Sequence, residues 1–435
     1  MFKRFPLTRQ YIKNNRSLME GVFAVNKPSG ITSSQFLGKV QKILTKASVF
    51  EESLNQMRKN KSHGKKQWKK NIKLKMGHGG TLDPLASGVL VIGLGSGTKR
   101  LGGYTNGSTK VYETVALLGG STTTGDSEGE LLSKTGSKHV DKDLLVKIKD
   151  RFVGSLEQIP PVFSALKMDG MPLYEYARKG LPIPRKLEAR NVTVSDFQLH
   201  DDSLSTDHDY TFLKSQVDED GETLVDKLKT NPSLNDHPLS FSKEFMEKCS
   251  KDFSLSSELE PIRELESDVD TESDDYRAPT LHFTTTVSSG TYIRSLISDY
   301  GRALGSSAYM VKLIRSRQAE WQLDKNCFEL QDFEDNPEEV WSKVLEKVLN
   351  KGSTVDVRKE MEIAKTEFKD IQSKEESKEK SEETTDVVET SEKKRDADGE
   401  LSEEPTKKQK LELDEETSKS IASTEEASAA EEIKL

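Results

Sequence analysis

Asp83 is the residue whose type and setting first suggest chemistry. It lies in GHGGTLDPLASGVLVIGLGSGTKRL, from Gly77 to Leu101, where glycines and a threonine precede it and a proline follows it. Glycines let the backbone approach other groups closely, and a proline restricts the residue before it. The stretch is therefore either an ordinary turn that contains an aspartate or a backbone shaped to hold one carboxylate in place.

Two further segments contain residues that could work with Asp83. Arg294 stands at the start of an expected helix, where the helix dipole favours acids over bases. An arginine in that position needs an anionic partner, and Asp83 would be one. Tyr112 lies in an alternating strand pattern, where it could simply be a rim residue of a core strand.

The usual catalytic sets are missing from the sequence. There is no G-x-S-x-G, no H-E-x-x-H and no phosphate loop ending in Gly-Lys-Ser/Thr. GLGSGTKR lacks the spacing of a dinucleotide-binding loop. The seven histidines are scattered, which argues against a metal cluster, and Cys249 and Cys327 stand in no metal-type spacing. The sequence predicts no metal and no cofactor, and the cysteine usage indicates a reducing compartment.

Hydrophobic periodicity and turn residues indicate the elements that would position these side chains. Strands are expected at Val22–Val25, over 110–119 and from Thr280; helices are expected over 33–44, 142–154, Leu173–Lys179, 293–304 and 336–349. Thr32 or Ser33 is available as an N-cap for the first helix, and Gly180 suits the end of the helix over Leu173–Lys179. No apolar run approaches the length of a membrane helix.

The charge of the chain is segregated. Residues 351–435 carry 16 Lys and Arg against 26 Asp and Glu, residues 201–276 carry 7 against 22, and the remaining chain carries 42 against 26. The part expected to fold is therefore basic, which favours a polyanionic partner such as nucleic acid. We expect 201–276 to be an acidic low-complexity insertion without a core and 351–435 to be a disordered charged tail.

Three other charged stretches have two interpretations each. Residues 46–75 form a basic insertion, either a solvated loop or an RNA-contacting one. Residues 1–20 form a basic arm, either a mitochondrial presequence or a solvated arm. The basic clusters Lys393-Lys394-Arg395 and 407–410 resemble a two-part nuclear-import signal, or are ordinary charge in a charged tail. These features favour the nucleus and the mitochondrion, with the cytoplasm also open.

Five motifs together resemble the TruB family of RNA pseudouridine synthases. They are GVFAVNKPSGITS, the Gly77–Leu101 stretch, KVYETVALLG, IPPVFSALKMDGMPLYEYARKG and VSSGTYIRSLISDYGRALG, in the family's order and covering about 200 residues. The resemblance implies an α+β fold with a mixed, mainly antiparallel sheet flanked by helices, in one catalytic domain over 21–350. Within the family, the pattern is most similar to stand-alone fungal enzymes that modify uridine 55 in the T-arm of tRNA.

The resemblance also implies roles for individual residues. Asp83 would be the catalytic carboxylate, attacking the uridine at C1′ or at C6, and Arg294 would pair with it. Tyr112 would stack on the target base and help to move a proton, and His78 would lie near the flipped-out nucleotide. Tyr292 would line the pocket. Three cationic residues would contact RNA: Lys27, Lys110 and Arg315.

The implied partners are tRNA, through its T-arm, and mRNA stem-loops that mimic it, with a monomeric enzyme and no membrane. The sequence lacks a clear run of strands for the C-terminal RNA-binding domain that many relatives carry. Two alternatives stay open: a guide-RNA-dependent rRNA pseudouridine synthase, and a non-catalytic tRNA-binding or tRNA-folding protein on the same fold.

Overall fold

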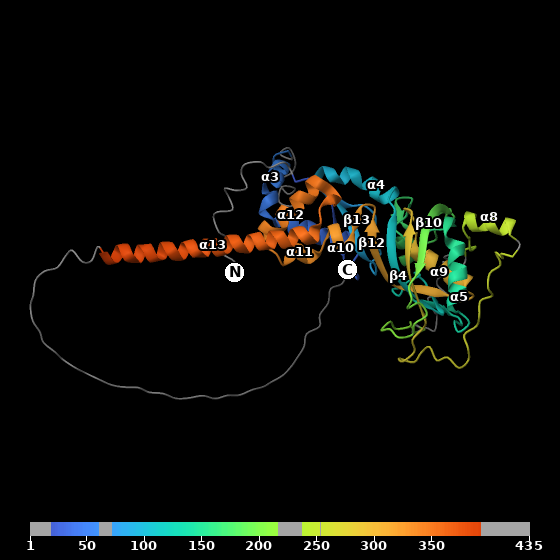
Figure 1. Ribbon diagram of the computed structural model, residues 1–435. Coiled ribbons are helices and arrows are strands. Elements are labelled where there is room, and N and C mark those ends of the chain that lie inside the picture. Colours follow the sequence, from blue (N-terminus) through green and yellow to red (C-terminus); the bar gives the residue numbers. More distant parts are fainter. Residues whose placement is uncertain (1–18, 61–71, 216–236, 253, 393–435) are drawn as a thin grey trace, which may run out of the picture. The chain divides into compact units, whose positions relative to one another are not determined.

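The computed structural model describes residues 19–60, 72–215, 237–252 and 254–392, and the chain divides into two units, Met1–Gln372 and Ser373–Leu435. The first unit is built on one ten-stranded sheet (Figure 1). Its path runs β14-β1-β3-β12-β4-β11-β10-β7, with β2 paired to β3 and β13 paired to β12. The strands of this sheet are β1 Gly21–Lys27, β2 Met76–His78, β3 Ser87–Leu94, β4 Lys110–Leu118, β7 Gly154–Gln158, β10 Arg190–Leu199, β11 Thr280–Val287, β12 Ala308–Gln318, β13 Trp321–Gln322 and β14 Cys327–Phe328.

Most neighbours in this sheet are antiparallel. Only the β1–β14 and β3–β12 pairs are parallel. Two small antiparallel pairs lie apart from it: β5 Gly120–Thr122 with β6 Leu131–Lys134, and β8 Lys167–Met168 with β9 Met171–Pro172. The structure confirms the predicted α+β class with a mixed, mainly antiparallel sheet.

Helices cover the two halves of the sheet and form two apolar cores. One core joins β1 and β3 to α2, α12 and the start of α13; the other joins β4, β10 and β11 to α5 and α9. The helices are α2 Ser33–Lys46, α3 Glu51–Asn60, α4 Leu101–Asn106, α5 Lys142–Lys149, α6 Leu173–Arg178, α8 Lys243–Lys251, α9 Ile293–Ala303, α10 Leu323–Asn326, α11 Leu330–Glu334, α12 Glu338–Lys351 and α13 Val357–Glu392.

The elements expected from periodicity are present. Thr32 caps α2 in a capping box with Gln35, as its position before the apolar pattern predicted. Gly180 has a φ of 60° just after α6, a conformation that glycine adopts without strain. The helix expected over 142–154 is shorter, because a 3₁₀ turn at Asp150–Phe152 leads directly into β7.

The basic insertion at 46–75 is only partly a loop. Residues Ser48–Phe50 form a 3₁₀ turn and α3 follows it directly, with Phe50 and Leu54 buried in the first core. Ile72 and Leu74 return to the same core. These four apolar side chains anchor the segment, and the Lys-rich residues 61–71 between them lie outside the described residues.

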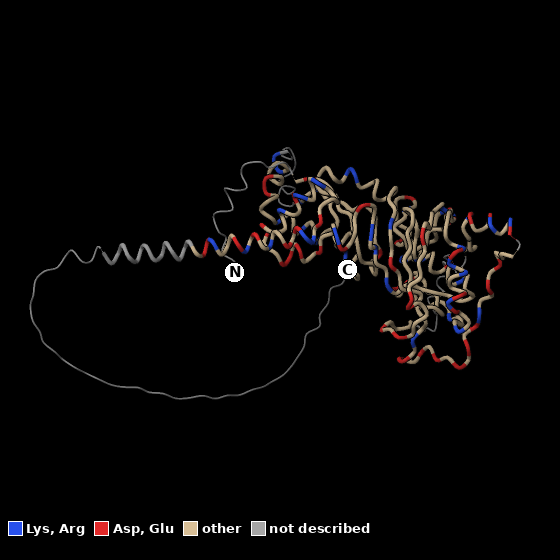
Figure 2. Tube along the Cα trace, viewed as in Figure 1, with Lys and Arg blue, Asp and Glu red and all other residues tan. Residues whose placement is uncertain are grey.

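The acidic segment 201–276 contributes to a core, which corrects the expectation that it would not. Phe212 is buried against Tyr309 of β12, and Phe241 packs on Phe152 with ring centroids 5.5 Å apart. These aromatic side chains anchor a segment along which Asp and Glu recur (Figure 2). Most of the acids that the structure describes in it are exposed, and Asp268 pairs with Lys138 at 2.8 Å. Residues 216–236 lie outside the described residues.

The folded part of the chain extends beyond residue 351, where the charged tail was expected to begin. Val357, Met361 and Ala364 of α13 are buried in the first core, because their spacing places them on one face of a helix. The part of α13 up to Gln372 therefore belongs to the folded unit. Of the second unit, the structure describes a helix up to Glu392.

Several predictions fall on residues outside the described part. They are residues 1–18 of the basic arm and the two basic clusters at 393–395 and 407–410. Among the residues that are described, no helix is long and apolar enough to cross a membrane. After β14, residues 329–392 contain helices and no strand.

Candidate active site

The structure brings Asp83 and Arg294 into direct contact across 211 positions of sequence. Nε of Arg294 donates to Oδ2 of Asp83 at 2.8 Å, as the position of an arginine in the first turn of α9 predicted. The Arg294 side chain is 5% exposed and that of Asp83 is 34% exposed. The guanidinium is thus enclosed while the carboxylate faces solvent.

Arg294 is held in one position by the rest of its surroundings. Its Nη1 donates to the carbonyl of Thr124 at 2.5 Å and its Nη2 to that of Phe163 at 2.8 Å. Burial alone would lower its pKa, but the Asp83 and Asp126 carboxylates outweigh burial and raise the pKa above its ordinary range. Arg294 is therefore a fixed positive charge that orients Asp83.

Lys27, Gly30 and Ser33 hold the two neighbours of Asp83 in the chain, Leu82 before it and Pro84 after it. Ser33 Oγ accepts from the Leu82 N–H at 2.8 Å and donates to the Leu82 carbonyl at 2.9 Å. The carbonyl of Pro84 accepts from the backbone N–H of Gly30 at 2.8 Å and from Lys27 Nζ at 3.2 Å. The turn that presents Asp83 is thus attached to the segment between β1 and α2.

Strand β12 and helix α4 hold the residues before Asp83. Gln318 Nε2 donates to the carbonyls of Gly79 at 2.5 Å and Tyr104 at 2.9 Å. A Cβ on Gly79 would lie 2.7 Å from Cβ of Tyr104, so only glycine fits there, and Gly80 has a φ of 110° that also favours glycine. The rigid backbone inferred from the glycines is thus fixed from both sides.

The other three expected supporting residues lie on strands β2 and β4 and at the start of helix α9. Tyr112 lies in β4 with its hydroxyl 3.5 Å from Nη1 of Arg315, and its side chain is largely buried. His78 ends β2, and burial lowers its pKa, which favours the neutral imidazole. Tyr292 is the N-cap residue of α9, and its backbone N–H and carbonyl are both bound to the amide of Gln158.

Lys27, Lys110 and Arg315 are not placed to contact RNA, which corrects that assignment. All three are buried, and their charged groups bind backbone carbonyls of this chain: Pro28, Ile31 and Pro84 for Lys27, Tyr104 and Ser108 for Lys110, and Val89 for Arg315. Burial lowers the pKa of Lys27 and of Lys110 to about 8. These cations hold the site together from within.

Two carboxylates of the site were missed by the sequence reasoning. Asp126 is buried, with Oδ2 3.6 Å from Nε of Arg294, and its Oδ1 accepts from Thr124 Oγ1 at 2.5 Å. Partial burial, together with Asp126 and Asp83, raises the pKa of Glu128. The available signal was the polar run Thr122-Thr123-Thr124-Gly125-Asp126, which interrupts the pattern after β4.

Comparison with known proteins identifies the class of enzyme that this site serves. The family model described as "TruB family pseudouridylate synthase (N terminal domain)" matches residues 65–221. The chain is 51% identical to tRNA pseudouridine synthase 4 of Saccharomyces cerevisiae over 364 residues, 80% of this chain and 90% of that protein. It is 35% identical to tRNA pseudouridine synthase 4 of Schizosaccharomyces pombe over 337 residues, 72% and 82% of the two chains.

A bacterial protein matches a shorter region. Similarity to tRNA pseudouridine synthase B of Syntrophotalea carbinolica is 36% identity over 181 residues, 42% of this chain and 49% of that protein. The protein is therefore an RNA pseudouridine synthase, an isomerase that converts uridine in RNA to pseudouridine. It belongs to the TruB family.

Proposed function

We propose that this enzyme isomerises uridine 55 in the T-arm of tRNA and that Asp83 is its catalytic carboxylate. The names of the similar yeast proteins support tRNA as the substrate. The observation that carries the assignment of Asp83 is the state of its two oxygens. Oδ2 is bound by Arg294, whereas Oδ1 accepts no hydrogen bond from any residue that the structure describes.

A carboxylate held in this way suits the reaction. In pseudouridine formation the C1′–N1 bond breaks, the uracil turns, and a C1′–C5 bond forms, with the proton on C5 exchanged for one on N1. The free oxygen of Asp83 attacks at C1′ or at C6, and the covalent step divides the reaction into two easier ones. Arg294 keeps the carboxylate in position and stabilises its charge.

The target base must leave its stack to reach Asp83, at a cost of a few kcal/mol. Tyr112 is proposed to stack on the extruded base, which offsets part of that cost, and its hydroxyl to help move the C5 proton. His78 is proposed to lie where the opened T-loop needs support, as a neutral imidazole. Tyr292, two residues before Arg294 and close enough to influence its pKa, is proposed to line the pocket.

RNA phosphates require cations other than the buried Lys27, Lys110 and Arg315. Lys99 and Arg100 are exposed just before α4, whose Tyr104 touches Gly79 of the Asp83 loop. We propose that they contact the backbone of the T-arm. The same recognition would extend to mRNA stem-loops that mimic a T-arm.

We also propose that the enzyme works in the nucleus and in the mitochondrion. The basic N-terminal arm and the basic clusters near the C-terminus support this distribution. Imaging of a fluorescent fusion, with and without residues 1–20, tests it: mitochondrial signal should depend on the arm. Unchanged mitochondrial signal after the deletion would contradict the presequence assignment.

The substrate is tested with the purified full-length protein and two tRNA transcripts. One transcript is unmodified and the other carries cytidine at position 55. Pseudouridine mapping should show conversion at position 55 of the first transcript alone, with no guide RNA added. A requirement for guide RNA, or modification at other positions only, would contradict the proposal; binding of both transcripts without conversion would favour a tRNA-folding protein.

A further inference from the structure

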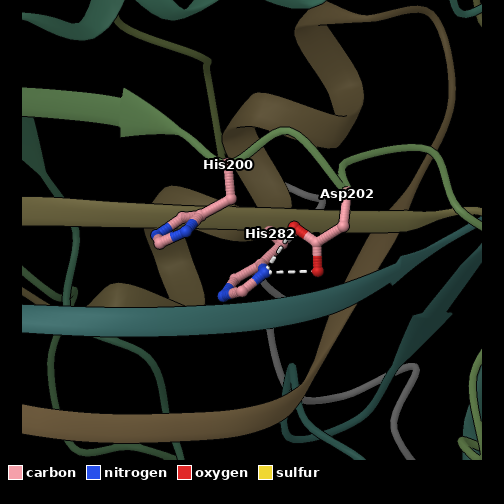
Figure 3. A group of neighbouring side chains, drawn as sticks. All are labelled: His200, Asp202 and His282. Carbon is pink, nitrogen blue, oxygen red and sulfur yellow. Dashed lines mark hydrogen bonds and ion pairs between the residues drawn. The ribbon is translucent and has the colours of Figure 1, made fainter.

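Two histidines and an aspartate meet at one end of strands β10 and β11 (Figure 3). His200 follows the last residue of β10, Asp202 lies two residues later, and His282 is within β11. Their potential ligand atoms all lie within 4.8 Å of one another. The backbone fixes the arrangement, because the N–H of His200 donates to the carbonyl of His282 at 2.9 Å.

This cluster lies on the side of the sheet opposite the isomerase site. Successive residues of a strand point to opposite faces. Tyr112 points toward the Asp83 loop, and the next residue of β4, Glu113, has its Oε1 3.6 Å from Nε2 of His282. The cluster is therefore separate from the Asp83 site.

One of the two ring nitrogens of His282 is buried without a hydrogen-bond partner. Nδ1 lies 2.7 and 2.8 Å from the two oxygens of Asp202. Nε2 is buried and has no hydrogen-bond partner, with Glu113 as its nearest carboxylate. A neutral imidazole has one N–H and one lone pair, so one nitrogen would turn its lone pair toward a carboxylate. A second proton or a metal ion on the ring would remove this repulsion between a nitrogen lone pair and a carboxylate.

We propose that His200, Asp202 and His282 bind a single divalent transition-metal ion of the Zn²⁺ type. Imidazole nitrogens and a carboxylate oxygen form a donor set that suits zinc, nickel and copper. The ion takes the position between Nδ1 of His282 and Asp202. Nε2 of His282 then carries its proton and donates to Glu113, the carboxylate–histidine–metal arrangement common around zinc.

Binding requires a local rearrangement that the structure permits. The rings of His200 and His282 are stacked, with centroids 3.9 Å apart and planes 4° apart, so their nitrogen lone pairs lie in nearly parallel planes and do not converge on one ion. His200 must rotate and release the hydroxyl of Thr284, which now lies 2.8 Å from its Nε2. Asp202 has a 63% exposed side chain and adjusts freely, while His282 stays fixed within β11.

The scatter of histidines along the sequence argued against a metal cluster. Pairing of β10 with β11 brings such distant residues together, because it places His282 beside Asp202, 80 positions earlier, and beside His200. Lys312, 3.2 Å from Glu113, compensates part of the negative charge and leaves Asp202 as the carboxylate for the ion.

The test uses full-length protein without a histidine tag, stripped of metal and titrated with Zn²⁺ near neutral pH against a chromophoric chelator. We expect one Zn²⁺ per chain. Replacing a ligand, as in His200→Asn or His282→Asn, should weaken binding at least as much as Glu113→Gln, for which a loss of about 10- to 100-fold is usual. The Co²⁺ absorption spectrum of the wild type should change in the same variants.

The matched control is His208→Asn, which removes a histidine of the same segment that binds the carbonyl of Ala278 instead. It should bind Zn²⁺ as the wild type does. Thermal unfolding shows whether each variant folds, and His200→Asn decides the matter if His282→Asn does not fold. The proposal is overturned if the wild type takes up no stoichiometric Zn²⁺, or if the ligand variants bind it as well as His208→Asn does. Neither result bears on the isomerase activity, which is measured separately.

Discussion

Replacing Ser33 by alanine tests how the Asp83 loop is held. Ser33 is buried, and its hydroxyl binds both the N–H and the carbonyl of Leu82, the residue before Asp83. Alanine leaves both backbone groups without that partner and leaves the shape of the site otherwise unchanged. The loop would then move toward other hydrogen-bond partners, and Asp83 would move with it.

The size of the effect follows from the two groups left unpaired. A buried donor or acceptor that loses its partner costs about 1–3 kcal/mol, so Ser33→Ala should lower the free energy of unfolding by about 2–4 kcal/mol after partial relaxation. A shift of a reacting group by about 1 Å costs on the order of 100-fold in rate. We therefore expect kcat to fall about 10- to 100-fold, with the affinity for tRNA little changed because phosphate contacts lie elsewhere.

The assay is single-turnover pseudouridine formation on a T-arm transcript, with binding and denaturant unfolding measured in parallel. Ser34→Ala is the matched control, since Ser34 is the next residue of α2 and is exposed. It should behave as the wild type in all three measurements. A Ser33→Ala enzyme with wild-type kcat and stability would refute the inference that Ser33 positions Asp83.

Three further predictions concern charge and packing. Arg294→Lys keeps the charge but cannot reach Asp83, Thr124 and Phe163 together, so the rate should fall at least about 100-fold, and an unchanged single-turnover rate would argue against the orienting role. Lys27 and Lys110 have pKa values of about 8 in the folded chain and about 10.4 unfolded. Because the unfolded chain binds more protons between those values, each lysine makes the free energy of unfolding rise with pH from about 8 to 10, by up to about 1.4 kcal/mol per pH unit. Denaturant unfolding across that range should show the rise in the wild type and a smaller one in Lys27→Met; equal slopes would contradict it. Phe212→Ala should lower the free energy of unfolding by about 3–5 kcal/mol. The control Leu255→Ala, at an exposed residue of the same segment, should change it by less than about 0.5 kcal/mol. Equal and small losses in both variants would show that 201–276 lies outside the core.

The pairing of Asp83 with Arg294 could be predicted because Arg294 stands where a helix disfavours a cation and Asp83 is a single carboxylate in a glycine-rich loop. A cation in the first turn of a helix is unfavourable unless an anion compensates it, and the glycine-rich loop offered that anion. The strand and helix positions followed from periodicity, as at β1 and α2. The helix rule and the periodicity depend on local sequence alone, whereas the choice of Asp83 as the partner of Arg294 was also supported by the family resemblance.

Burial and strand pairing could not be derived in the same way. Lys27 and Arg315 are cations of a basic chain, and composition gives no sign that both are fully buried on backbone carbonyls. The composition of 201–276 is dominated by acids and therefore gives no indication that Phe212 is buried against Tyr309. His200 and His282 meet because the antiparallel pairing of β10 and β11 places Leu199 opposite Phe283, and that pairing is a property of the whole fold.

The central claim is that the Asp83 carboxylate performs the isomerisation. Asp83→Asn changes only the charge and one acceptor oxygen, and Asp169→Asn makes the same change in an exposed turn with a φ of 49°, which asparagine tolerates. Each variant is given equimolar T-arm transcript, and pseudouridine at position 55 and transcript binding are both measured. We predict full conversion by Asp169→Asn and no conversion by Asp83→Asn, with binding retained in both. Conversion of the transcript by Asp83→Asn at a rate near that of the wild type would contradict the account.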